Sequence, residues 1–170
     1  IYEDLNGKLD YVLTCIGGGG LIAGVATYLK GKNKNIQVIA VEPSGAGGMY
    51  ISIENKKVTS PPTIDTFVDG AAVKTVGDIT FDICRKKVDA FYKEPEGKIC
   101  KIMVELYQNE GIITEPAGAT SVAGLSNIRE QIKGKIVVCI ISGGNNDIMR
   151  YPEILEKSLV YQGKKHYFIV

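Results

Sequence analysis

The chain has 170 residues, of which 45% are hydrophobic and 23% are charged, and its formal net charge is +1 at neutral pH. This length is enough for one sizeable hydrophobic core, or for part of a larger one. The small net charge and the scattered lysines give no basis for nucleic-acid binding, no apolar run is long enough to span a membrane, and no basic and then apolar leader opens the chain.

Strand and helix patterns alternate along the chain, as is typical of a parallel sheet covered by helices. In chain order the predicted elements are a strand at 11–16, a helix at 21–30, a strand at 36–42, a helix at 47–57, an irregular stretch at 58–74, a helix at 78–88, a short strand at 90–93, a helix at 98–109, a helix that ends at about 132 and a strand at 135–141. We therefore predict an α/β fold in which helices pack on both faces of a parallel sheet.

The four cysteines lack the Cys-x-x-Cys spacing of zinc and redox sites, and Cys15 and Cys139 fall within apolar strand candidates. We expect reduced thiols and hence a cytoplasmic location. His166 is the only histidine, so neither a histidine-rich metal site nor a Ser-His-Asp triad is supported.

Four consecutive glycines, Gly17, Gly18, Gly19 and Gly20, separate the first predicted strand from the first predicted helix. The first turn of a helix has unpaired N–H groups and a partial positive charge, and glycine lets an anion approach the backbone closely. The sequence therefore predicts binding of a phosphorylated small molecule here. The structural alternative is a glycine-rich turn that lets the helix pack tightly on the strand.

A second junction of this kind follows the last predicted strand, where Ser142 precedes two glycines. Ligands of open α/β sheets bind beyond the carboxyl ends of the strands, so both junctions could face one ligand. The alternative role for Ser142 is the N-cap of a helix that begins near residues 145–147.

A dinucleotide-binding site is a competing interpretation of the glycine loop. Gly18, Gly20 and Ala23 satisfy the spacing G-x-G-x-x-A, and Glu42 ends the next strand at about the distance needed to contact a ribose hydroxyl. This interpretation leaves the second junction and the segment at 115–119 without a role.

Five segments occur in the order and at the spacing of one enzyme family. They are Ile16-Gly17-Gly18-Gly19-Gly20-Leu21-Ile22-Ala23-Gly24, Val41-Glu42-Pro43, Phe67-Val68-Asp69-Gly70-Ala71-Ala72-Val73, Thr114-Glu115-Pro116-Ala117-Gly118-Ala119 and Ser142-Gly143-Gly144-Asn145-Asn146-Asp147. Together they resemble threonine dehydratase (threonine ammonia-lyase), a fold-type II pyridoxal-phosphate enzyme with a tryptophan synthase β-like fold, over nearly the whole chain. The chain resembles serine racemase and the serine dehydratases less than it resembles threonine dehydratase.

The resemblance implies pyridoxal 5'-phosphate as cofactor and gives roles to individual residues. The cofactor phosphate would bind to Gly17, Gly18, Gly19, Gly20 and Leu21. Ser142 would donate to, or accept from, the pyridine nitrogen, and Gly70 and Ala71 would line the ring. Glu115 would lie near the ring, but Thr114-Glu115-Pro116 is equally an ordinary helix start with proline in the first turn.

Two departures from the family pattern matter. Relatives such as serine racemase bind a divalent cation through residues matching Glu42 and Ala46 and an acidic residue two positions later, which is Gly48 here, so we expect no metal site. The family's Schiff-base lysine and its Ser-x-Gly-Asn-His segment have no match here, so we expect no catalytic residue in this chain. We expect residues 1–158 to be the carboxyl-terminal part of the catalytic domain, its large-domain portion, and residues 159–170 to lead into a truncated ACT-like regulatory domain.

The resemblance implies that the intact parent deaminates L-threonine to 2-oxobutanoate and ammonia for isoleucine biosynthesis, with L-serine as a second plausible substrate, and that it is a cytoplasmic homo-oligomer without membrane or nucleic-acid partners. Without the lysine, this chain alone is expected to be inactive. The alternatives are a sibling serine dehydratase or racemase, a nucleotide-binding oxidoreductase domain, and a non-catalytic module that only binds a phosphorylated ligand.

Overall fold

A parallel four-stranded sheet forms the centre of the molecule in the computed structural model, which describes residues 1–168. The strand order is β3-β2-β1-β4, and the strands are β1 (Tyr11–Cys15), β2 (Gln37–Pro43), β3 (Ala90–Glu94) and β4 (Val137–Cys139). The inner strands β1 and β2 are buried over nearly their whole length, which explains their continuous apolar sequence.

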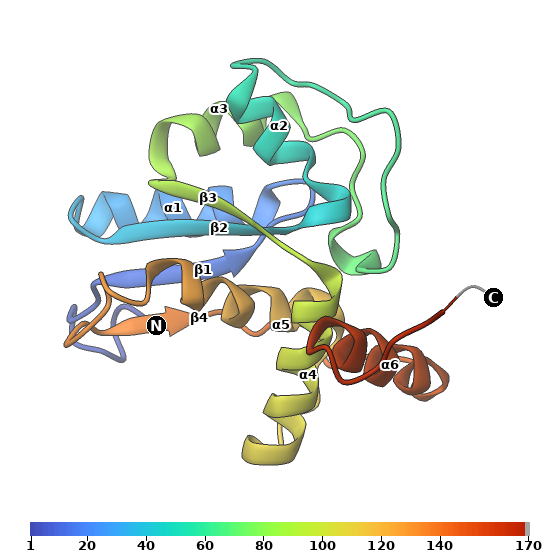
Figure 1. The fold of residues 1–170 in the computed structure, drawn as a ribbon. Helices are drawn as coiled ribbons and strands as arrows, with labels where there is room; N and C mark the ends of the chain where they lie inside the picture. The colour runs from blue at the N-terminus through green and yellow to red at the C-terminus, as the bar shows by residue number, and fades with distance from the viewer. Residues whose placement is uncertain (169–170) are drawn as a thin grey trace.

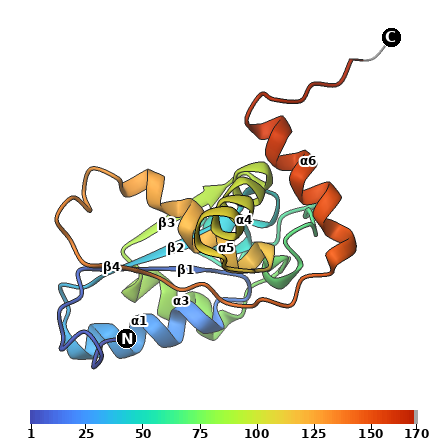
Figure 2. The same cartoon turned by 90° about the horizontal axis from the view of Figure 1, so that it is seen from below.

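Helices cover both faces of this sheet, so the predicted fold class is confirmed (Figures 1 and 2). On one face lie α1 (Gly20–Lys32), α2 (Gly48–Glu54) and α3 (Asp78–Lys87); on the other lie α4 (Glu96–Glu110), α5 (Pro116–Ala123) and α6 (Tyr151–Tyr161). Within residues 1–168, no helix is both long and apolar enough to cross a membrane.

Alternating residues of the inner strands supply the two sides of the core. Val12 and Val38 belong to a cluster with Ile22 and Leu29 of α1, whereas Leu13 and its neighbours Ile39 and Val41 pack with Ile128. Successive side chains of a strand point to opposite faces, so a continuous apolar strand can bind helices on both sides. This packing fixes the position of the strand ends and of the loops that follow them.

Two predicted elements differ from the structure, and one helix of the structure was not predicted. The helix expected to reach about residue 132 ends at Ala123 and continues as the 3₁₀ helix η3 (Gly124–Ile128), where a Cβ at Gly124 would lie 2.5 Å from Val41 Cγ2. The strand expected at 135–141 is reduced to β4. Helix α6 was not predicted, although Pro152 in its first turn and the buried Ile154 are ordinary helix signals.

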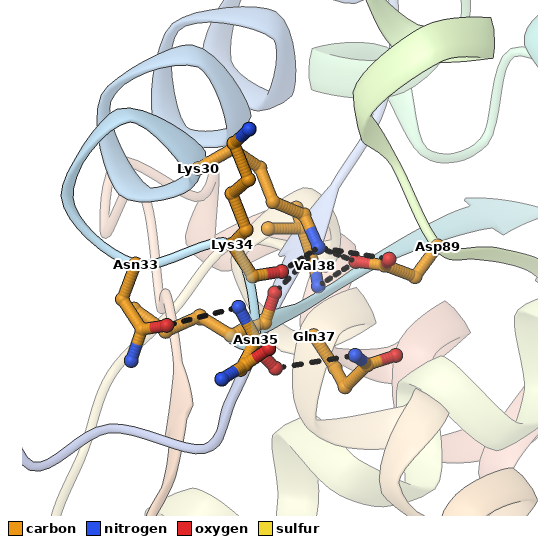
Figure 3. A network of polar contacts seen from close by, with 8 residues as sticks. Lys30, Asn33, Lys34, Asn35, Gln37, Val38 and Asp89 are labelled. Atoms are coloured by element: carbon orange, nitrogen blue, oxygen red, sulfur yellow. Dashed lines mark hydrogen bonds and ion pairs between the residues drawn. The ribbon is translucent and has the colours of Figure 1, made fainter.

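Hydrogen bonds and an ion pair connect the elements at the amino-terminal end of the sheet (Figure 3). Lys30 Nζ of α1 donates to the carbonyl of Ile36 at 2.7 Å and to Asp89 Oδ1 at 2.8 Å, and Asp89 Oδ2 accepts the Val38 N–H at 2.7 Å. This network ties the end of α1 to the starts of β2 and β3. Residues 169 and 170, the end of the expected lead-in segment, lie outside the described residues.

Candidate functional site

The carboxyl ends of β1 and β4 meet at the point where the strand order reverses. After β1 the chain crosses to β2 on one side, whereas β4 lies on the other side of β1. Loops that leave such a point diverge and open a crevice. A cavity of about 210 Å³ lies there, lined by Cys15, Ile16, Gly17, Gly18, Gly19, Gly20, Leu21, Ile22, Gly70, Glu115, Ala117 and Ser142.

The glycine loop presents backbone donors to this cavity. Gly19 has a left-handed conformation with φ 92°, and the 13-residue helix α1 begins at the next residue. Ala23 is the first residue of this turn whose N–H is paired, with the Gly19 carbonyl at 3.0 Å; within the described structure the amides of residues 17–22 donate to no protein acceptor. Unpaired donors of this kind at a helix N-terminus are suited to binding an anion.

Packing explains two of the four glycines and leaves two unexplained. A Cβ at Gly17 would lie 3.2 Å from Ala71 Cα, and one at Gly19 would lie 2.8 Å from Met49 Cε. Gly18 and Gly20 have no atom within 4 Å of a Cβ position. Tight packing therefore accounts for only half of the loop, and the open space at Gly18 and Gly20 fits a bound phosphate, as pyridoxal phosphate requires.

The 3₁₀ helix η2 (Asp69–Ala71) forms the wall beside the loop. Gly70 lines the cavity, and a Cβ there would lie 2.9 Å from Ala117 Cβ and 3.2 Å from Glu115 Oε1. Ala71 is fully buried behind Gly17, where it supports the loop. The structure therefore brings η2 and the glycine loop together, with Gly70 at the cavity and Ala71 behind the loop.

Glu115 lies at the start of helix α5 and also lines the cavity. It occupies the N-cap position of α5, Pro116 follows in the first turn, and its side chain makes no capping hydrogen bond. Its N–H donates to the Gly143 carbonyl at 3.1 Å, and its carboxylate lies between Gly70 and Gly143, where a Cβ on either glycine would press against it. A backbone role at the helix start thus leaves the carboxylate free to line the cavity.

Ser142 follows β4 and lines the same cavity as the glycine loop. Its hydroxyl has no hydrogen-bond partner among residues 1–168. The next helical turn, the 3₁₀ helix η4 (Ile148–Arg150), is capped by Asp147, whose carboxylate accepts the Met149 N–H at 2.9 Å. The alternative interpretation of Ser142 as a helix N-cap is therefore wrong.

Glu42 does not face the cavity. It is buried at the end of β2, and its carboxylate accepts the N–H groups of Met49 at 2.9 Å and Tyr50 at 2.7 Å at the start of α2. Burial raises its pKa to about 7, against the opposing effect of these two bonds and of Lys93. The carboxylate is thus already engaged, which argues against the ribose contact of the dinucleotide interpretation.

Metal ligands and reactive thiols are not gathered at this site. No group of three or more His, Cys, Asp or Glu side chains that could hold a metal occurs in the described part of the chain. All four cysteines are free, and burial raises the pKa of the Cys15 thiol to about 12. A neutral thiol at the cavity wall contributes packing, since the thiolate is the nucleophilic form.

Comparison with known proteins decides the family. Residues 1–143 match the family described as pyridoxal-phosphate dependent enzyme. The chain belongs to this family. The cofactor expected from the sequence is therefore the family's cofactor, and the oxidoreductase interpretation loses its support.

Curated relatives and solved structures agree with this assignment. The chain is 52% identical over 166 residues to L-threonine dehydratase biosynthetic IlvA of Staphylococcus aureus, covering 97% of this chain and 39% of that protein. It is 49% identical to the protein of the same name from Halalkalibacterium halodurans, covering 100% and 41%. The processed form of threonine deaminase isoform 2 from Solanum lycopersicum superposes with a TM-score of 0.87 at 33% identity, covering 92% of this chain and 46% of that one. Maize serine racemase superposes with a TM-score of 0.80 at 30% identity, covering 95% and 50%.

The chain thus spans about two fifths of the length of the curated relatives named here. Sequence reasoning missed four residues that line the cavity, namely Cys15, Ile16, Ile22 and Ala117. Ile16, Ile22 and Ala117 lie within the quoted motif segments, where they were given no role, and Cys15 directly precedes the first segment. Proximity in sequence to the motifs was the signal that could have identified them.

Proposed function

We propose that residues 1–158 are the carboxyl-terminal part of the catalytic domain of a threonine dehydratase, and that residues 159–170 lead into an ACT-like regulatory domain. The observation that carries this proposal is the glycine loop with unpaired amides and Ser142 around one cavity, in a chain 52% identical to a biosynthetic threonine dehydratase. The intact protein would deaminate L-threonine to 2-oxobutanoate and ammonia.

The residues around the cavity have distinct roles in this proposal. The N–H groups of residues 17–20 and of Leu21 bind the cofactor phosphate, assisted by the partial positive charge of α1. Gly70 and the supporting Ala71 leave room for the flat ring, and Glu115 lies beside it. The open space at Gly18 and at Gly20 supports this arrangement.

Ser142 determines how strongly the ring can withdraw electrons. When bound, pyridoxal phosphate supplies an electron-withdrawing ring that acidifies the α-carbon of an amino acid. A neutral hydroxyl at the pyridine nitrogen cannot stabilise a positive charge there as a carboxylate would, so Ser142 keeps the ring a moderate electron sink. This suits elimination of a β-hydroxyl group, in which the leaving group removes the developing negative charge.

This chain alone is proposed to be inactive, because it has no match to the family's cofactor-linking lysine motif. Binding of the phosphate and orientation of the ring would be its contributions to the intact enzyme. The amino-acid substrate would be L-threonine, with L-serine second.

Two further properties of the intact protein belong to the same proposal. A cytoplasmic location is supported by four free cysteines. A homo-oligomeric state is supported by exposed apolar side chains on and beside α6, namely Ile148, Met149, Leu155 and Val160.

The test replaces the matching segment of the Staphylococcus aureus relative with this chain. We expect the chimera to bind pyridoxal phosphate and to form 2-oxobutanoate from L-threonine with a higher kcat/KM than it forms pyruvate from L-serine, while the 170-residue chain alone forms neither. A chimera that binds the cofactor but prefers serine, or that racemises serine, would favour the sibling activities. Cofactor binding without any turnover would favour the non-catalytic module.

A further inference from the structure

Thr80 touches the glycine loop from outside the cavity. It lies in the first turn of α3, and it is not among the residues that line the cavity. Its hydroxyl Oγ1 donates to the carbonyl oxygen of Gly18 at 2.7 Å, and it also lies 2.9 Å from the Gly77 carbonyl. A residue 62 positions from Gly18 in the sequence therefore contacts the loop backbone directly.

This hydrogen bond fixes the direction of the next N–H group. A trans peptide is planar, so the Gly18 carbonyl and the Gly19 N–H point in opposite directions. Because the carbonyl points toward Thr80 on α3, the Gly19 N–H points away from α3, and Gly19, unlike Thr80, lines the cavity. A Cβ at Gly19 would lie 2.9 Å from Thr80 Cβ, so the α-carbon also faces α3.

We propose that Thr80 is a positioning residue for the anion-binding loop. Its hydroxyl holds the Gly18–Gly19 peptide so that the Gly19 N–H donates to the cofactor phosphate. This rests on the proposed function of the loop. Without the hydroxyl, the left-handed Gly19 can rotate its peptide plane at little cost, since glycine has wide conformational freedom, and the donor is lost from the site.

A purely structural role for the hydroxyl predicts a different outcome. Serine and threonine hydroxyls in a first helical turn commonly bind nearby backbone groups, as the contact with Gly77 illustrates. In that case removal of the hydroxyl lowers the melting temperature and leaves anion binding unchanged. A buried hydroxyl elsewhere supplies the control: Ser158 of α6 is 1% exposed and accepts a hydrogen bond from Gln162 Nε2 at 3.0 Å.

The experiment compares Thr80→Val, Thr80→Ser and Ser158→Ala in the full 170-residue chain. Dissociation constants for pyridoxal phosphate and for inorganic phosphate are measured by calorimetry, beside the melting temperature. We expect Thr80→Val to weaken both by about tenfold, the effect of one lost charge-assisted hydrogen bond. Thr80→Ser keeps the wild-type affinities, and Ser158→Ala keeps them even where its melting temperature falls.

A second measurement needs no variant. When the wild-type chain is titrated with inorganic phosphate, the Gly19 amide resonance should shift with the binding curve. An unmoved Gly19 amide, or equal affinities in wild type and Thr80→Val, overturns the role of Thr80 while leaving the site intact. If the wild-type chain binds neither pyridoxal phosphate nor inorganic phosphate, the proposed anion site itself fails, and the role of Thr80 with it.

Discussion

At the amino-terminal end of the sheet, Lys30 and Asp89 are paired with each other and with the backbone of Ile36 and Val38 at the start of β2 (Figure 3). At the carboxyl end, by contrast, the amides of residues 17–22 and the hydroxyl of Ser142 have no partner in the described structure. Unpaired N–H groups at a helix N-terminus are satisfied by water or by a ligand, so the donors around this cavity are available for binding.

The two ends of the sheet therefore have different roles: the paired groups stabilise the fold, and the unpaired groups are available for binding. Where every polar group is paired, substitution should lower the free energy of unfolding and leave ligand binding unchanged. Where the donors are free, substitution should change binding and leave stability nearly unchanged. Mutations at each end therefore test whether the two regions are independent.

The largest effect is expected at Gly18. Gly18→Asp adds a side chain into open space and a negative charge where the phosphate would bind. Charge repulsion at about 4 Å and an effective dielectric constant of about 20 costs about 4 kcal/mol, or roughly a thousandfold in Kd. Calorimetry with pyridoxal phosphate measures this loss.

The isosteric Gly18→Asn separates charge from shape and should lose much less affinity. Both variants should keep a melting temperature near that of the wild type, unlike Gly19→Asp, whose Cβ would press against Met49 and Thr80. Wild-type affinity in Gly18→Asp would show that the loop does not bind the anion.

A pH-dependent effect is expected from Glu42, the buried carboxylate at the end of β2. Burial raises its pKa to about 7, whereas the unfolded chain releases this proton near 4.5. Between these values the native state binds more protons than the unfolded state, so Glu42 lowers stability as pH rises from about 4.5 to about 7, by roughly 3 kcal/mol in total.

Urea unfolding of the wild type and Glu42→Gln at about pH 5 and about pH 8 measures this contribution, since other titrating groups cancel in the difference. The stability of the wild type relative to Glu42→Gln should be lower at the higher pH. A difference that does not change with pH would mean that Glu42 titrates near its ordinary value in the folded chain.

A smaller loss of stability is expected at the opposite end of the sheet. Lys30→Met keeps the aliphatic stem but leaves Asp89 without its cation, in a pair whose side chains are 14% and 27% exposed. Removing one partner of a largely buried pair should cost about 2 kcal/mol here, below the range for fully buried pairs. Urea unfolding measures the loss, and phosphate affinity should not change. A double-mutant cycle with Asp89→Asn isolates the coupling between the two side chains.

Sequence patterns predicted the elements that are buried on both sides, because their apolar runs are continuous. The inner strands β1 and β2 begin and end within a residue of the predicted limits. The edge strand β4 is shorter than predicted because it pairs with β1 alone within the described sheet, over three residues. Local apolar character cannot reveal how far a partner strand extends.

The candidate site shows the same division between local and long-range information. Glycine and serine motifs at strand ends identified the residues that the structure brings around one cavity, although their roles in binding stay predictions. The contact from Thr80 to Gly18 was not predictable in this way, since it depends on how α3 is placed against the loop and no periodic pattern encodes that placement. The Asp147 cap, by contrast, is local, because its carboxylate accepts the N–H two residues later, and the preference of Asp for N-caps could have identified it.

The smallest effect is expected at Ser142, and it tests the comparison most directly. Its hydroxyl lines the cavity without a protein partner in the described chain, so Ser142→Ala should leave the melting temperature of the chimera unchanged. If the hydroxyl binds the pyridine nitrogen, turnover of L-threonine should fall by about fivefold, with most of the loss in kcat, as for one lost hydrogen bond of about 1 kcal/mol. Steady-state kinetics and thermal unfolding, measured on one preparation, distinguish a binding role of Ser142 from a stabilising one. A lower melting temperature with normal kcat would place Ser142 with Lys30 and Asp89 among the groups that only stabilise the sheet.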